Sequence, residues 1–381
     1  MTTVESAVNA RITQLIHRQI EEGRQLGVQV CAYLDGKVVV DTWAGKVAPG
    51  DERPVGPGTL FSSFSTTKGV AATMLHILAD RGLIDYEAPV ASYWPEFAEA
   101  GKEDVTVMQA ICHLAGIHTA PVPNTSQYVI NWDKGLDYVA NAKPAWEPGT
   151  ATGYHAITFG WIIGGIIERA AGKSFKQVLA EDLTRPLGID DEMFVGIPEG
   201  VDDRLASLQT AERPRQFPVP IPPDHDFFKA MPVESDVNFN SPDIRRSVLP
   251  SANGHFTARS LAKMYAALAL DGELDGVRLV SKGRMKEATC IVTKDVDRVL
   301  MMPMRKGGGY FLGGSINDVV GVTGPRETAF GHSGAGGSTA FADPEVGLSV
   351  AVTINKMQNS LQGEGPTFEI CNAIREELGL N

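Results

Sequence analysis

Strand-forming sequence lies near both ends of the chain, and helix-forming sequence fills the middle. Residues 28–34 and 37–43 are two β-rich runs on either side of an Asp-Gly pair, a pattern typical of a tight β-hairpin. Residues 338–342 and 348–354 form a second pair of strand-like runs around another turn. We therefore expect the N-terminal hairpin and the C-terminal strands to share one antiparallel sheet, which makes the helical middle an insertion.

Apolar residues spaced three and four apart predict helices around this sheet and within the insertion. Helices over residues 7–22 and 366–378 would cover the sheet, and a helix over 257–270 precedes the C-terminal strands. The segment 214–250 is rich in proline with sparse apolar residues, which predicts a long ordered loop or lid that could control substrate access. Helical spacing within the insertion is found at residues 70–82, 107–114, 158–171 and 175–183.

The expected fold is therefore α+β, an antiparallel sheet made by the N- and C-terminal segments and flanked by helices, with an inserted, mostly helical lobe. We expect residues 1–62 and 250–381 to form the sheet lobe, and residues 63–249 to form the helical lobe, including the loop at 214–250. Apolar residues make up 43% of the chain and charged residues 21%, which is ordinary globular usage and enough to form a sizeable core.

The charge balance argues against nucleic acid and membrane as partners. The chain has 34 basic and 46 acidic residues and no basic run, whereas nucleic acids and anionic membranes are bound through clustered cations. The start lacks the pattern of a secretion signal, and the apolar stretch at 159–167 is too short to span a bilayer, so we expect a cytoplasmic protein. No metal site is indicated, because the cysteines form no C-x-x-C pair and His113 and His118 have no accompanying carboxylate pattern.

Ser65 and Lys68 form the most informative motif, S-x-x-K at the start of an expected helix. A serine in the first helical turn and a lysine three residues later project from one face, so that hydroxyl and amine can touch. The helix N-terminus favours negative charge at Ser65, and its backbone N–H can face a developing oxyanion. A second copy, Ser260 with Lys263, is explained by a surface serine and a lysine that extends to solvent.

Two later segments distinguish the first copy from the second: Gly-Tyr-His-Ala at 153–156, and Phe-Gly-His-Ser-Gly-Ala-Gly-Gly at 330–337, immediately before a strand. With them the sequence resembles the serine β-lactamase and penicillin-binding-protein superfamily, particularly class C β-lactamases and family VIII carboxylesterases. The motifs of that superfamily are S-x-x-K, Y-x-N and K-T-G. The order and coarse spacing match over nearly the whole chain, and segments 106–117 and 250–254 are similar in kind to family segments beside the cleft.

The resemblance implies a role for each motif residue. Ser65 is expected to be the nucleophile, and Tyr154 with Lys68 to take its proton and later to activate water or an alcohol. A phenol near neutral pH can act as a base only if its anion is stabilised, and the Lys68 ammonium is the expected stabiliser. The N–H groups of Ser65 and Ala335 are expected to form the oxyanion hole, with Gly334 allowing close backbone approach. The reaction needs no cofactor.

Two departures from the family motifs bear on the substrate. His332-Ser333-Gly334 replaces K-T-G, and a histidine is at most partly charged near pH 7, so recognition of a substrate carboxylate is weakened. Ala156 replaces the asparagine of Y-x-N, which removes an amide that meets the side chain of β-lactam substrates. His332 either contacts the ligand or only hydrogen-bonds within the site. Weaker candidates for substrate binding, for each of which ordinary packing is the commoner explanation, are Tyr128, Trp132, Phe227, Phe228, Asn253 and His255.

These features predict a serine esterase that cleaves small carboxylic esters by double displacement. Three alternatives stay open: an acyltransferase that passes the acyl group to an alcohol, a weak β-lactamase or D-alanyl peptidase, and an inactive scaffold. Retention of Ser65, Lys68 and Tyr154 argues against the scaffold. The sequence does not indicate an oligomeric state.

Overall fold

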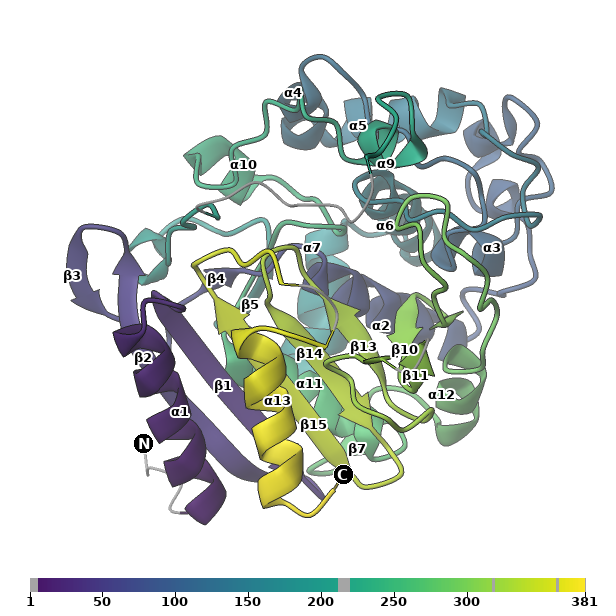
Figure 1. The fold of residues 1–381 in the computed structure, drawn as a ribbon. Helices are drawn as coiled ribbons and strands as arrows, with labels where there is room; N and C mark the ends of the chain where they lie inside the picture. The colour runs from purple at the N-terminus through teal and green to yellow at the C-terminus, as the bar shows by residue number, and fades with distance from the viewer. Residues whose placement is uncertain (1–5, 212–219, 317–318, 361–362, 381) are drawn as a thin grey trace.

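An eight-stranded antiparallel sheet is the centre of the computed structural model, which describes residues 6–211, 220–316, 319–360 and 363–380 (Figure 1). Its strand order is β3-β2-β1-β15-β14-β13-β10-β9. The sheet thus joins the first strands of the chain to the last ones. The strands are β1 (Gly27–Leu34), β2 (Lys37–Ala48), β3 (Asp51–Pro54), β9 (Lys306–Gly307), β10 (Tyr310–Leu312), β13 (Phe330–Ser333), β14 (Thr339–Asp343) and β15 (Leu348–Ile354).

Pairing between β1 and β15 confirms the expected shared sheet. Val30 lies opposite Val352, and seven residue pairs run antiparallel from Val28 to Leu34. β1 also pairs with β2 around the Asp-Gly turn, which confirms the hairpin. Both central strands are almost fully buried, because helices cover both faces of the sheet.

The helices at the two ends of the chain, α1 (Ala7–Glu21) and α13 (Pro366–Glu377), lie side by side on one face of the sheet (Figure 1). Ile12, Ile16 and Ile370 pack there against sheet residues that include Val350 and Val352. On the opposite face, α11 (Ala258–Ala269) contacts β1, β14 and β15. The apolar spacing in the sequence therefore predicted all three covering helices, and the expected fold class is confirmed.

The helical lobe is built around α2 (Thr66–Asp80), which is buried along nearly its whole length. It packs on α6 (Thr158–Ala171) on one side and on β13 on another, and so connects the inserted helices to the sheet. Further helices of this lobe and its surroundings are α3 (Val107–Ile111), α4 (Thr125–Ile130), α5 (Trp132–Asn141), α7 (Phe175–Val178), α8 (Arg185–Leu187) and α12 (Lys282–Ala288). Among the described residues, no helix has the length and apolar character needed to cross a membrane.

The proline-rich segment contains more regular structure than the sequence suggested. Residues 212–219 lie outside the described part of the chain, but the remainder includes the short helices α9 (Asp226–Ala230) and α10 (Pro242–Arg246). Pro242 is at the first turn of α10, where a proline is compatible with helix. Ala230 packs in a small apolar cluster with Tyr154, so this segment lies beside the candidate site.

Candidate active site

Ser65 lies at the turn that starts α2, directly after a residue in a left-handed backbone conformation. Phe64 has φ +45°, and Thr67 donates its side-chain hydroxyl to the Phe64 carbonyl at 2.5 Å. Ser65 itself is helical, with φ −68° and ψ −6°, and its side chain makes no capping hydrogen bond. The hydroxyl is therefore not used to hold the helix end, and it is free to face Lys68.

Lys68 is fully buried, and its Nζ atom has three oxygen neighbours. These are Ser65 Oγ at 3.2 Å, the Ala156 carbonyl at 2.8 Å and the Ser251 carbonyl at 2.9 Å. Burial holds the pKa of Lys68 well below its usual value. A neutral amine fits this surrounding, because its two N–H groups can donate to the two carbonyls while its lone pair accepts the Ser65 hydroxyl.

The Tyr154 ring lies under the same amine, with Lys68 Nζ 4.7 Å from the ring centroid. Burial raises the pKa of Tyr154, and a hydrogen bond with the Ser65 side chain opposes this rise only in part. The sequence led us to expect a phenolate stabilised by a Lys68 ammonium. The structure favours a neutral phenol beside a neutral amine, which holds the same number of protons but avoids two buried charges.

The end of β13 lies against the turn that carries Ser65. A Cβ atom placed on Gly334 would be 2.1 Å from the Ser63 carbonyl oxygen and 3.2 Å from Thr66 Oγ1, so only glycine fits. The Gly334 N–H donates to the Ser338 carbonyl at 2.7 Å, which closes a tight turn around Ala335. Within the described residues, neither the Ser65 N–H nor the Ala335 N–H donates a well-formed hydrogen bond, so both are available to an oxyanion.

His332 is buried beside this turn, and it is neutral. Its Nδ1 atom is 2.8 Å from the Ser333 carbonyl, and its ring stacks on Phe311 with centroids 4.4 Å apart. Burial, with a further contribution from Lys68, lowers the pKa of His332 to about 3. Its Nε2 atom has no partner among the described residues. Ser333, next in the motif, shares a hydrogen bond with the Thr339 hydroxyl at 2.9 Å.

The weaker binding candidates lie in ordinary packing surroundings. The fully buried Asn253 amide donates to the Ile244 carbonyl at 2.5 Å and the Ser247 carbonyl at 2.6 Å. Tyr128 packs edge-to-face on Tyr138, and Phe228 packs in the same way on Phe227. Among the described residues, no hydrogen bond or ring contact joins these three candidate side chains to the side chain of Ser65, Lys68 or Tyr154.

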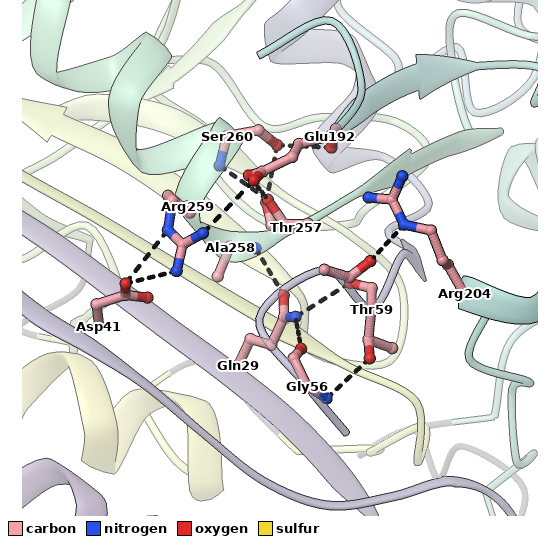
Figure 2. A network of polar contacts seen from close by, with 11 residues as sticks. Gln29, Asp41, Gly56, Thr59, Glu192, Arg204, Thr257, Ala258, Arg259 and Ser260 are labelled. Atoms are coloured by element: carbon pink, nitrogen blue, oxygen red, sulfur yellow. Dashed lines mark hydrogen bonds and ion pairs between the residues drawn. The ribbon is translucent and has the colours of Figure 1, made fainter. Parts of the chain in front are cut away.

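The second S-x-x-K copy has a structural role. Ser260 is fully buried in the first turn of α11, and its hydroxyl donates to the carbonyls of Glu192 and Thr257 at 2.9 and 3.0 Å (Figure 2). The sequence-based interpretation of a surface serine was therefore wrong for Ser260. The neighbouring Arg259 pairs with Asp41 on β2, 2.7 Å away, so this network fastens α11 to the sheet.

A buried ion pair behind Tyr154 was not indicated by any sequence motif. Asp297 and Lys306 are paired within the core, with side-chain exposures of 0% and 1%. Asp297 Oδ1 accepts the backbone N–H of Tyr154 at 3.1 Å. Only the three-dimensional structure brings these residues together, because Tyr154 lies more than a hundred positions earlier in the chain. No cluster of three potential metal ligands is present in the described ranges.

Comparisons with known proteins agree with the fold. A family model described as Beta-lactamase matches residues 12–369. The Mycobacterium tuberculosis protein Esterase/beta-lactamase LipL is 34% identical over 360 residues, which cover 89% of this chain and 79% of that protein. The structure of a penicillin-binding protein homologue from Caulobacter crescentus superposes with a TM-score of 0.90 and 36% identity over 98% of this chain and 99% of its own. A family VIII carboxylesterase gives a TM-score of 0.89 and 34% identity over the same shares.

Proposed function

The chain belongs to the beta-lactamase family, and from this we propose that it is a serine hydrolase that cleaves small carboxylic esters through an acyl-enzyme. The observation that carries the proposal is the contact of Ser65 Oγ with Lys68 Nζ at 3.2 Å, with the Tyr154 phenol close enough to the Ser65 side chain for that side chain to lower its pKa. A nucleophile within reach of a buried, neutral amine is the arrangement that acyl transfer requires.

In the acylation step, Ser65 Oγ attacks the ester carbonyl while Lys68 Nζ accepts the hydroxyl proton. The backbone N–H groups of Ser65 and Ala335 donate hydrogen bonds to the oxyanion, so no cationic side chain is needed to stabilise it. The Tyr154 phenol also interacts with Ser65, and it can donate a proton to the departing alkoxide. Acylation therefore leaves a Lys68 ammonium beside a Tyr154 phenolate, and each charge stabilises the other.

Deacylation reverses these proton movements. Tyr154 takes a proton from the attacking water, the acyl carbon forms a bond to the water oxygen, and the bond to Ser65 Oγ breaks. Lys68 then returns its proton to Ser65 Oγ, so the resting protonation state is restored. The ion pair expected from the sequence thus belongs to the acyl-enzyme, while the resting enzyme holds the neutral pair.

The substrate preference follows from His332 and Ala156. The lowered pKa of His332 leaves this ring uncharged at neutral pH, so it provides no cation for a substrate carboxylate. Ala156 offers no side-chain amide for the acylamino group of a β-lactam. Both features favour uncharged esters, in agreement with a relative named as an esterase and a structural neighbour described as a carboxylesterase.

Intact-mass measurement after treatment with an organophosphonate tests the proposal. One adduct on Ser65, together with loss of p-nitrophenyl acetate turnover, is the expected result. The Ser65→Ala variant should take up no label and the Ser260→Ala variant should take up one. An adduct at another serine, or nitrocefin turnover as fast as ester turnover, would contradict the assignment.

A further inference from the structure

Asp297 and Lys306 form a buried ion pair that contacts the tyrosine loop, which we define as residues 152–157 before α6. Lys306 Nζ contacts Asp297 Oδ2, and it also donates to Thr152 Oγ1 at 2.6 Å. Lys306 belongs to β9 at the edge of the main sheet, whereas Thr152 and Tyr154 belong to the loop that precedes α6. The pair therefore ties the tyrosine loop to the sheet.

Asp297 uses its second oxygen for three backbone N–H groups. Oδ1 accepts from Tyr154 at 3.1 Å and from Val299 and Leu300 at 2.8 Å each. The last two contacts fold residues 297–300 into a tight turn, and that turn packs Val299 against the Tyr154 cluster. A single carboxylate thus fixes both the backbone of Tyr154 and an apolar neighbour of its ring.

Burying both charges carries a desolvation penalty, which makes an ion pair an unfavourable means of fixing a loop. A well-packed apolar pair of similar volume is often equally stable or more stable, so a buried ion pair is weak evidence for a purely stabilising role. What an apolar pair could not supply is the acceptor for the Tyr154 N–H. The distinguishing feature of this pair is therefore its directional contact with the backbone of a reacting residue.

We propose that Asp297, held by Lys306, is a positioning residue that fixes Tyr154 for proton transfer at Ser65. This inference rests on the proposed esterase function. It predicts that loss of the Oδ1 acceptor slows the chemical step even where the fold is intact, because a displacement of about 1 Å at a reacting group reduces rate by about a hundredfold.

Two double variants separate positioning from stability. Asp297→Asn with Lys306→Met removes both charges but keeps an oxygen that can accept the Tyr154 N–H. Asp297→Leu with Lys306→Met also removes both charges, and it removes the acceptor as well. In the leucine variant three buried N–H groups lose their acceptor, so its thermal unfolding midpoint should be the lower of the two. At a temperature where both variants are folded, kcat for p-nitrophenyl acetate should be lowered about 10- to 100-fold only in the leucine variant, with KM changed less than about threefold.

Asp41→Asn is the matched control, because Asp41 forms a half-buried ion pair with Arg259 that fastens α11 to the sheet. It should lower the unfolding midpoint and leave kcat unchanged. A leucine double variant with wild-type kcat would overturn the proposal. Wild-type protein that neither cleaves the ester nor takes up the phosphonate would instead contradict the esterase function itself.

The pH profile of the single variant Asp297→Asn gives a second readout if the leucine variant does not fold. The polar and titratable groups that face Tyr154 are Ser65, Lys68, His113, His332 and Asp297, and of these the Asp297 charge raises the pKa of the phenol. Its removal should move the alkaline limb of kcat to lower pH. A folded Asp297→Asn variant whose alkaline limb stays at the wild-type position would show that the carboxylate does not act on the Tyr154 phenol, and it would overturn the proposal.

Discussion

Gly334→Ala is the substitution whose effect the structure specifies most directly. The new Cβ atom would be 2.1 Å from the Ser63 carbonyl oxygen, whereas real Cβ atoms essentially never approach closer than 3.0 Å. The turn after β13 must therefore withdraw by at least about 0.9 Å, the difference between these distances. Ser63 cannot yield instead, because its N–H is bonded to the Gly254 carbonyl at 2.9 Å and its own carbonyl accepts from Thr66.

This withdrawal acts on catalysis through the next residue. The Ala335 N–H moves with Gly334, and a donor about 1 Å too far from the oxyanion no longer makes a useful hydrogen bond. Loss of one oxyanion donor lowers kcat by about 10²- to 10³-fold, or about 3–4 kcal/mol. Overpacking costs about 1–3 kcal/mol in addition, so the free energy of unfolding should also fall.

The assay is steady-state turnover of p-nitrophenyl acetate, with the unfolding midpoint measured on the same preparation. Gly283→Ala in α12 is the control, because a Cβ atom there meets no atom within 4 Å and alanine favours helix. The control should keep wild-type kcat. A folded Gly334→Ala variant within about threefold of wild-type kcat would refute the argument that this turn supplies the second oxyanion donor.

Three further predictions follow from the burial of the site. Lys68→Met should lower kcat by about 10³-fold or more and abolish phosphonate labelling, since the resting Tyr154 phenol keeps its own proton and cannot accept that of Ser65; rapid labelling of this variant would exclude Lys68 as the base. Because burial lowers the pKa of Lys68, the amine is neutral over a wider pH range, and kcat/KM should fall on acidification as Lys68 gains a proton. His332→Gln replaces a ring with a pKa of about 3, so this variant should leave the pH profile of kcat/KM between about pH 5 and 8 unchanged in stopped assays. An ester that carries a carboxylate on its acyl group should have a kcat/KM at least about tenfold below that of its uncharged analogue, and equal values measured at low salt would contradict the neutral site.

Local patterns were sufficient to predict the framework of this molecule. The hairpin around residues 35–36 and the covering helices follow from two- and 3.6-residue periodicities, which each segment carries by itself. Ser65 and Lys68 were found together because a single helical turn places them on one face. Such features depend on neighbours a few residues apart, and the sequence records these directly.

Features that depend on tertiary burial could not be predicted from local sequence patterns. Asp297 and Lys306 lie in stretches without a motif, and their importance arises only when β9 and the tyrosine loop meet. The protonation of Lys68 and Tyr154 is a similar case, because it depends on how much water reaches them. Ser260 shows the converse, since its local motif is identical in type but its hydroxyl is used by a helix start.

The buried ion pair and the neutral amine have one property in common: both keep the net charge around Ser65 low. Burial is the first cause that lowers the pKa of Lys68, His113, His155 and His332, so a group of potential cations is kept neutral. Burial lowers the pKa of Lys306 as well, but Asp297 opposes this, and the charge of Lys306 is balanced by the Asp297 carboxylate. The oxyanion of an ester is then stabilised by fixed backbone N–H groups, which neither titrate nor attract carboxylates. A site built in this way can create an ion pair between Lys68 and Tyr154 during the reaction, because no permanent net charge biases the proton toward either residue beforehand.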